Sequence, residues 1–169
     1  MAINLFSRVV PAIALFSASV LMALNYQSMP FASGLTADVI ANGIGSSTIT
    51  TNNDVDGVSY AFVAKDFQLT STSAAITYGI PVDGTVNSVV AATPGLKFQL
   101  ADLNVNNSLR LAAVNDNGTL AFTTAKPVTK LYMLAVSGSG TSTVSAVVNF
   151  TDGSSQTFSS ISLADWYNG

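Results

Sequence analysis

Short runs of β-branched and aromatic residues, separated by Gly, Asn, Asp and Pro, follow one another from residue 35 to residue 163. This succession constrains the fold more than any other feature, because such runs favour strands and the separating residues favour turns. The runs recur roughly every 8–14 residues, which is typical of a β-sandwich or barrel. The predicted strands are residues 35–40, 58–63, 74–78, 85–90, 96–100, 108–114, 119–123, 130–137, 143–150 and 156–163.

The clearest hairpin lies near the C-terminus. Apolar and polar residues alternate over residues 143–150, and they alternate again over residues 156–163 except where Ser160 intervenes. Asp152 and Gly153 stand between the two runs, and Asp-Gly in this position is a strong turn signal. These residues therefore predict two antiparallel strands joined by a tight turn.

Residues 131–136 (LYMLAV) are apolar at every position. A strand that is covered on both faces shows such a continuous apolar run, whereas a strand with one solvated face alternates. The run therefore predicts a central strand that is buried between two layers.

The N-terminus differs in composition from the rest of the chain. Arg8 is the only charged residue before Asp38, and residues 9–24 are apolar apart from two serines. This length is close to that of a signal-peptide core and slightly short of a membrane span. Three interpretations stay open: a cleaved signal peptide, a retained anchor or filament-core helix over residues 3–26, and an ordinary buried helix.

If the segment is a signal, residues 30–34 (PFASG) provide the nearest stretch of small residues for cleavage. We therefore divide the chain into a hydrophobic helix, either signal peptide or anchor, at residues 1–34 and a β-sandwich domain at residues 35–169. A β unit of this size can bury a core as one domain.

The composition excludes several classes of function. The chain has no Cys and no His, all nine acidic residues are Asp, and only 9% of the residues are charged. Disulfides, thiolate or imidazole metal sites and Ser-His-Asp catalysis are therefore impossible. The net charge of −3 argues against nucleic-acid binding, which needs a basic face. We expect no enzyme activity.

Two Asp-containing segments are rich in oxygen ligands and end in Gly. Asp54 and Asp56 lie in the sequence DVDG, and Asp116 lies in NDNG. Calcium prefers six to eight such oxygens, so these three residues are the candidate metal ligands. The alternative is turn formation, which Asp, Asn and Gly favour without any ion. No other cofactor is expected.

Aromatic residues near the C-terminus provide a candidate binding surface. Trp166 and Tyr167 follow Asp165 directly. Exposed aromatic rings stack on sugars or dock partners, which makes these three the candidate ligand-binding residues. The alternative is that Trp166 caps the core at a strand end. Tyr60 and Phe62 are expected in the core or at a strand edge.

Parts of the sequence resemble a known kind of module. Residues 36–45 read TADVIANGIG, residues 148–154 read VNFTDGS and residues 164–169 read ADWYNG. These stretches resemble the jelly-roll-like β-sandwich modules of large secreted and surface proteins of Bacteroidetes-type bacteria. The resemblance implies a jelly-roll-like antiparallel β-sandwich with an accessory role in adhesion or carbohydrate binding, and it implies no catalytic residues. Such modules continue past the last stretch, so we expect either a fragment or a partner chain that completes the sheet.

We therefore expect an exported, non-catalytic module, extracellular or at the cell surface, that binds a glycan or a surface protein. The alternative is a structural subunit of an extracellular filament or surface layer. Such a subunit would assemble through a retained N-terminal helix or by strand addition. Contact with a membrane is expected only through residues 3–26, if they are retained.

Overall fold

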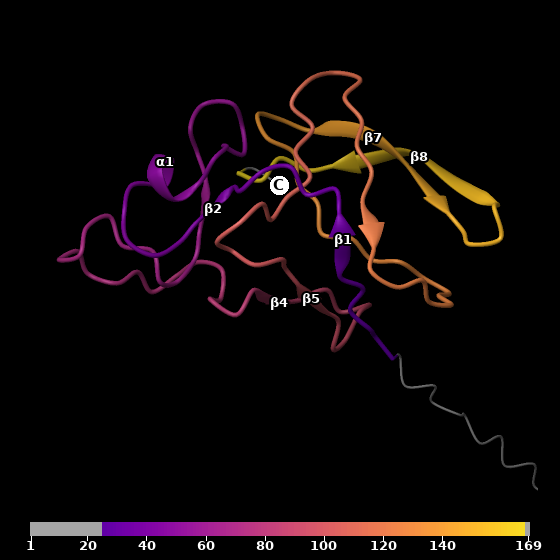
Figure 1. The fold of residues 1–169 in the computed structure, drawn as a ribbon, viewed down its shortest axis with the longest axis horizontal. Helices are drawn as coiled ribbons and strands as arrows, with labels where there is room; N and C mark the ends of the chain where they lie inside the picture. The colour runs from indigo at the N-terminus through magenta and orange to yellow at the C-terminus, as the bar shows by residue number, and fades with distance from the viewer. Residues whose placement is uncertain (1–24, 168–169) are drawn as a thin grey trace, which may run out of the picture.

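The computed structural model describes residues 25–167 (Figure 1). The predicted N-terminal helix lies outside them as far as residue 24. Residues 25–34, which we assigned to the same hydrophobic segment, form no helix and contain a short strand at Phe31–Ser33, so that part of the prediction is wrong. Among the described residues, no helix has the length and apolar character needed to cross a membrane. The elements in chain order are β1 (Phe31–Ser33), β2 (Ile40–Ala41), α1 (Ser47–Thr50), β3 (Phe62–Val63), β4 (Thr85–Asn87), β5 (Lys97–Gln99), β6 (Ala121–Phe122), β7 (Ser142–Asn149) and β8 (Ser155–Leu163). The prediction of an all-β class is confirmed.

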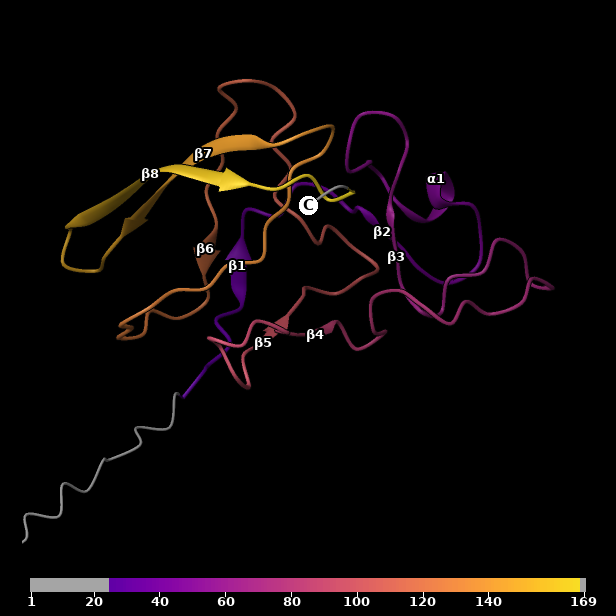
Figure 2. The same cartoon turned by 180° about the vertical axis from the view of Figure 1, so that it is seen from behind.

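The described strands pair two by two. β1 pairs with β6, β4 with β5 and β7 with β8 in antiparallel fashion, whereas β2 and β3 run parallel. Long loops without regular secondary structure join one strand pair to the next (Figure 2). The jelly-roll-like sandwich stays a prediction, because the described strands form short pairs rather than two extended sheets.

The buried core lies around β2. Ala37, Val39 and Ile40 pack with Ala64 and Leu103, and all five side chains are buried. Two of the five are alanines, and Ala64 has no exposed surface. Ala64 directly follows β3, and its amide donates to the Ala41 carbonyl at 2.8 Å, which continues the pairing of β2 and β3 by one residue.

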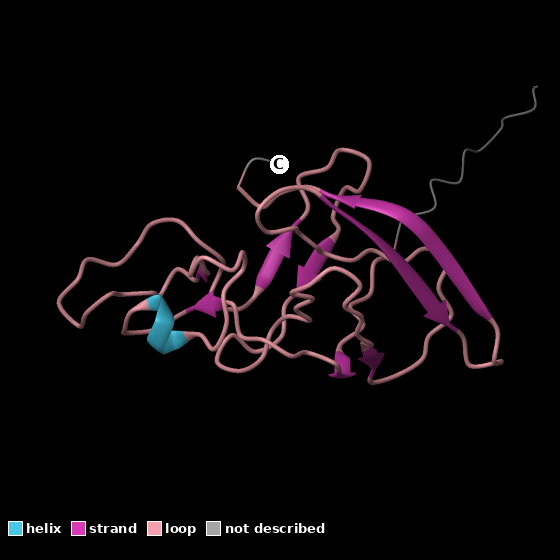
Figure 3. Ribbon diagram, turned by 90° about the horizontal axis from the view of Figure 1, so that it is seen from above, coloured by secondary structure: helices cyan, strands magenta, loops and turns pink. Residues whose placement is uncertain are grey.

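The β7–β8 hairpin is the longest strand pair and lies at the opposite end of the molecule from α1 (Figure 3). Val144 pairs with Ile161 and Ala146 pairs with Phe158, so β8 has one additional residue between these pairs. We assign this β-bulge to Ser160, whose φ of 57° is left-handed. Phe158 and Ile161 are three residues apart and would lie on opposite faces of a regular strand, but the extra residue brings them to the same face. This explains why Ser160 interrupts the alternation of apolar and polar residues in the sequence.

The prediction of a central, buried strand at residues 131–136 is wrong. The structure assigns no strand there, and four of the six side chains are large, apolar and exposed. An apolar run is buried on both faces only where neighbouring strands and a second layer cover it. Beyond this segment, Ser137 forms an isolated parallel bridge with Asp165, next to the end of β8.

Candidate functional site

The predicted aromatic residues lie just after β8, where a short backbone ladder holds them. The Ser137 amide donates to the Ala164 carbonyl, and the Trp166 amide donates to the Ser137 carbonyl, both at 2.9 Å. These bonds fix the position from which the Trp166 side chain leaves the backbone. The Asp165 carboxylate accepts the Tyr167 amide at 3.3 Å, so Asp165 closes the turn that carries both rings.

Four rings gather at this turn, and we call Tyr60, Phe62, Trp166 and Tyr167 the aromatic cluster. The Trp166 ring centroid lies 6.0 Å from that of Tyr60 and 5.7 Å from those of Phe62 and Tyr167. Trp166 is half-buried, whereas Tyr60 is exposed and Tyr167 is 76% exposed. Trp166 is therefore the ring that the other three contact, and two of its neighbours, Tyr60 and Tyr167, face solvent.

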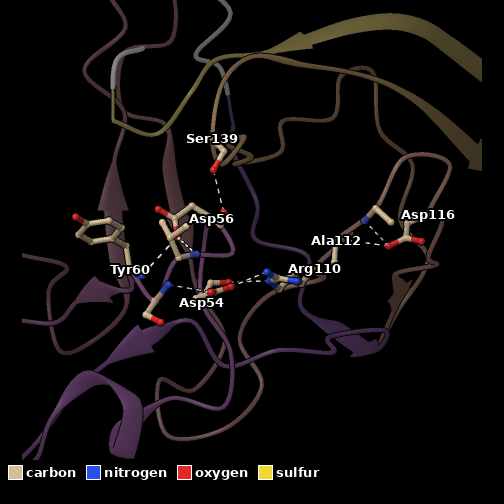
Figure 4. Close-up of polar contacts among 10 residues, drawn as sticks. Asp54, Asp56, Tyr60, Arg110, Ala112, Asp116 and Ser139 are labelled. Atoms are coloured by element: carbon tan, nitrogen blue, oxygen red, sulfur yellow. Dashed lines mark hydrogen bonds and ion pairs between the residues drawn. The ribbon is translucent and has the colours of Figure 1, made fainter.

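Tyr60 reaches the cluster because the Asp54–Tyr60 loop is closed by its own carboxylates (Figure 4). Asp56 Oδ1 accepts the amides of Val58 at 3.0 Å and Tyr60 at 3.4 Å. Asp54 Oδ2 accepts the Ser59 amide at 3.0 Å, and Ser59 has a left-handed φ of 74°. The acidic residues therefore shape the loop that presents Tyr60.

Arg110 holds the same loop from outside. Its Nη2 donates to Asp54 Oδ1 at 2.6 Å and its Nε donates to the Asp54 carbonyl at 2.7 Å. The Ser59 amide and the Arg110 guanidinium both favour the ionised form and lower the pKa of Asp54 below its ordinary value. The loop is therefore joined to a distant part of the chain by a charged contact.

The segment after residue 136 packs against the other side of the loop. The Ser139 hydroxyl donates to the Asp56 carbonyl at 2.9 Å. A side chain at Gly138 would collide with the Val55 carbonyl oxygen, so glycine is needed for this close approach. The backbone that holds Trp166 and the loop that holds Tyr60 are thus connected directly.

Asp116, the third candidate calcium ligand, closes a separate turn. Its Oδ2 accepts the amides of Ala112 and Ala113, both at 2.8 Å, and Asn115 in that turn has a left-handed φ of 70°. Over residues 25–167, no three acidic side chains come together in a group that could hold a metal ion. The hydrogen bonds of Asp54, Asp56 and Asp116 favour the turn alternative, and calcium stays an untested prediction.

A cavity of about 570 Å³ lies elsewhere, between residues 31–35 and residues 104–106, and it shares no lining residue with the aromatic cluster. Asp38 and Asn52 also line it, and Asn52 Nδ2 donates to Asn106 Oδ1 at 2.8 Å. Sequence reasoning missed this amide-rich surface. The repeated Asn residues in the sequence could have indicated this surface, but Asn is also common in turns.

Sequence reasoning did single out Trp166, Tyr167 and Asp165, which the structure brings together. It placed Tyr60 and Phe62 only as core or edge residues, because nothing in the local pattern indicates a contact with residues so far along the chain. No protein-family model, curated protein or solved structure matches this chain.

Proposed function

We propose that this chain is an exported, non-catalytic binding module that holds a carbohydrate against its aromatic cluster. The observation that carries the proposal is that two exposed rings, those of Tyr60 and Tyr167, lie next to the half-buried ring of Trp166, with centroids 6.0 and 5.7 Å from it. Exposed apolar side chains that stand singly are ordinary, whereas a contiguous group of exposed rings marks an interaction surface.

The chemistry of the cluster suits a sugar. Carbohydrates present apolar C–H faces, which stack on aromatic rings, and hydroxyls, which need donors and acceptors nearby. The phenol groups of Tyr60 and Tyr167 and the carboxylate of Asp165 supply such polar groups beside the rings. Because Trp166 is fixed by the Ser137 backbone and by Phe62, little side-chain freedom would be lost on binding.

The acidic residues around the cluster support a role in binding rather than in chemistry. Asp54 and Asp56 use carboxylate oxygens to close the loop, and Asp54 is also paired with Arg110. Groups that act as general acids or bases need access to the reacting proton. In this arrangement the carboxylates position Tyr60 for ligand contact.

A glycan array followed by calorimetry on the best ligand tests the proposal. Tyr167→Ala should weaken binding about three- to tenfold, which corresponds to the loss of one aromatic stacking contact. Tyr78→Ala is the matched control, because Tyr78 is 68% exposed, against 76% for Tyr167, and lies outside the cluster. Equal binding by all three proteins, or no glycan bound at all, would contradict the proposal.

The second candidate is a structural subunit of an extracellular filament or surface layer, and the β7–β8 pair favours it. In the described structure this hairpin is a two-stranded sheet, so the outer edges of both strands are open. Two-stranded sheets are marginally stable alone, and open edges accept further strands. Electron microscopy of the protein at increasing concentration tests this candidate, which predicts ordered assemblies.

A further inference from the structure

Asp38 is a buried carboxylate that lines the cavity of about 570 Å³ beside β1, and only 7% of the residue is exposed. Its Oδ1 accepts the Asn107 side-chain amide at 2.6 Å and the Ile40 backbone amide at 3.3 Å. Within residues 25–167, its Oδ2 accepts no hydrogen bond and is not sealed from solvent. This second oxygen therefore opens onto the cavity.

No cationic side chain accompanies this charge in the described part of the chain. The ion pair found there joins Arg110 to Asp54, and neither Lys nor Arg lines the cavity. A buried charge is costly unless it is paired or hydrogen-bonded, and Asp38 satisfies only one of its two oxygens in this way. The carboxylate therefore offers a position for a cation on its cavity side.

A second, smaller cavity extends the same negative surface. Its volume is about 170 Å³, and it adjoins the first cavity because Asn104 lines both. Asp66, Asp83 and Asp102 line it, again without a Lys or Arg. Clefts lined by charges of one sign raise the local concentration of counter-ions. The two cavities together therefore favour a positively charged ligand.

We propose that the two cavities hold an aliphatic diamine in its doubly protonated form, with one ammonium group at Asp38 Oδ2 and the other in the second cavity. An ammonium group donates three hydrogen bonds and accepts none. Ser33 and Asn106 supply further oxygen acceptors in the lining of the first cavity, and Leu35 and Val105 supply apolar surface for the carbon chain. The lining therefore contains partners for both parts of such a ligand.

The spacing of the carboxylates favours an organic cation over a metal ion. Ligands of a metal ion must converge on one point, and within residues 25–167 no three acidic side chains do so. Carboxylates that are set apart match a ligand whose charges are separated by a carbon chain. The volume of the first cavity also lies in the range of sites for small molecules.

Isothermal titration calorimetry of the full chain with diaminobutane tests the proposal, and butanediol is the uncharged ligand of the same length. We expect the diamine to bind and the diol to show no binding. Asp38→Asn keeps an Oδ1 acceptor for Asn107 and Ile40 but removes the charge, so the affinity for the diamine should fall at least about tenfold. Asp152→Asn, at an exposed residue of the β7–β8 turn, is the matched control and should bind like the natural chain.

A second variant tests the cavity without changing the carboxylate. Ala32 is exposed in β1 and lines the first cavity, so Ala32→Trp should narrow it and weaken diamine binding even if Asp38→Asn fails to fold. Thermal unfolding shows which variants are folded.

Three results would overturn the proposal: no diamine binding by the natural chain, equal binding of the diol, or diamine binding that no folded variant of this pair weakens. Calcium binding that Asp38→Asn abolishes, without any diamine binding, would overturn it in favour of a metal site. Neither cavity shares a lining residue with the aromatic cluster, and glycan binding is measured separately. Failure here therefore leaves the proposed function standing.

Discussion

At the scale of single residues, the Asp54 carboxylate pairs with Arg110 and also closes the loop that carries Tyr60. It accepts the Ser59 amide and pairs with Arg110, and these contacts lower its pKa below the ordinary value of 3.8. A carboxyl group whose pKa is lower in the folded state stabilises that state when ionised. Its contribution is complete above about pH 5 and is lost as the pH falls through the lowered pKa.

Arg110→Ala should lower the free energy of unfolding at pH 7 by about 1 kcal/mol, because a partly exposed ion pair contributes no more. The pKa of Asp54 should rise towards its ordinary value in this variant. The natural chain loses the contribution of the ionised Asp54 carboxylate as the pH falls below about 5, so the free energy of unfolding should fall less with acidification in the variant than in the natural chain. Urea unfolding at several pH values measures both effects. Lys97→Ala, at an exposed lysine in β5, is the control and should change neither. A parallel acid dependence in all three proteins would contradict the role of the pair.

Two rings of the aromatic cluster have different expected roles: Trp166 contributes to packing, and Tyr167 is the expected contact for a ligand. Trp166→Ala should destabilise the fold by about 2 kcal/mol, less than for a fully buried Trp because the ring is half-exposed. Tyr167→Ala should change stability by less than about 0.5 kcal/mol, as expected for an exposed side chain. Thermal and urea unfolding of the two variants check this. Equal destabilisation would mean that Tyr167 is part of the packing rather than a contact surface.

At the scale of elements, the sequence pattern predicts those strands and turns that interactions between residues close in the chain determine. The hairpin expected at residues 143–150 and 156–163 is found as β7 and β8, because alternation and an Asp-Gly turn act over short distances. Residues 131–136 were misjudged because burial depends on which strands cover a segment, and that is decided by contacts far along the chain. The same holds for the site, where Tyr60 meets Trp166 only through tertiary packing.

The bulge at Ser160 gives the hairpin its register, and its backbone conformation can be tested. Ser160→Gly should be neutral or stabilise the fold by up to about 1 kcal/mol, because glycine adopts a left-handed φ without strain. Ser160→Val should destabilise it by about 1–2 kcal/mol, because a β-branched residue is strained there. The melting temperatures from thermal unfolding of the natural chain and the two variants measure this order of stability. A valine variant as stable as the glycine variant would show that Ser160 does not adopt this conformation.

At the scale of the whole molecule, strand β1 lies within the part of the chain that the sequence assigns to the N-terminal segment, yet it pairs with a strand of the β unit. β1 pairs with β6, and the Thr123 amide donates to the Pro30 carbonyl at 2.9 Å. Removal of the chain up to Gly34 would therefore leave β6 without its partner. If the hydrophobic segment is a cleaved signal, the structure favours cleavage before β1 over cleavage at the small residues near Gly34.

The intact mass of the protein from its own source, with N-terminal sequencing, should show that Phe31–Ser33 remain in the mature chain. A terminus at Met1 would mean a retained segment and strengthen the filament or anchor interpretation. A terminus between residue 24 and Phe31 would mean a cleaved signal and a secreted module. A mature chain that begins at Gly34 or later would contradict the role given to β1.

The most direct test of the central claim, that the aromatic cluster binds a carbohydrate, uses the fluorescence of Trp166. This residue is the only tryptophan in the chain, so its emission reports on the cluster alone. Titration with the best glycan from the array should change the emission saturably, with the midpoint that calorimetry gives, and Tyr167→Ala should shift that midpoint to higher concentration. Glycan binding that leaves the Trp166 emission unchanged would place the ligand elsewhere on the molecule and contradict the claim.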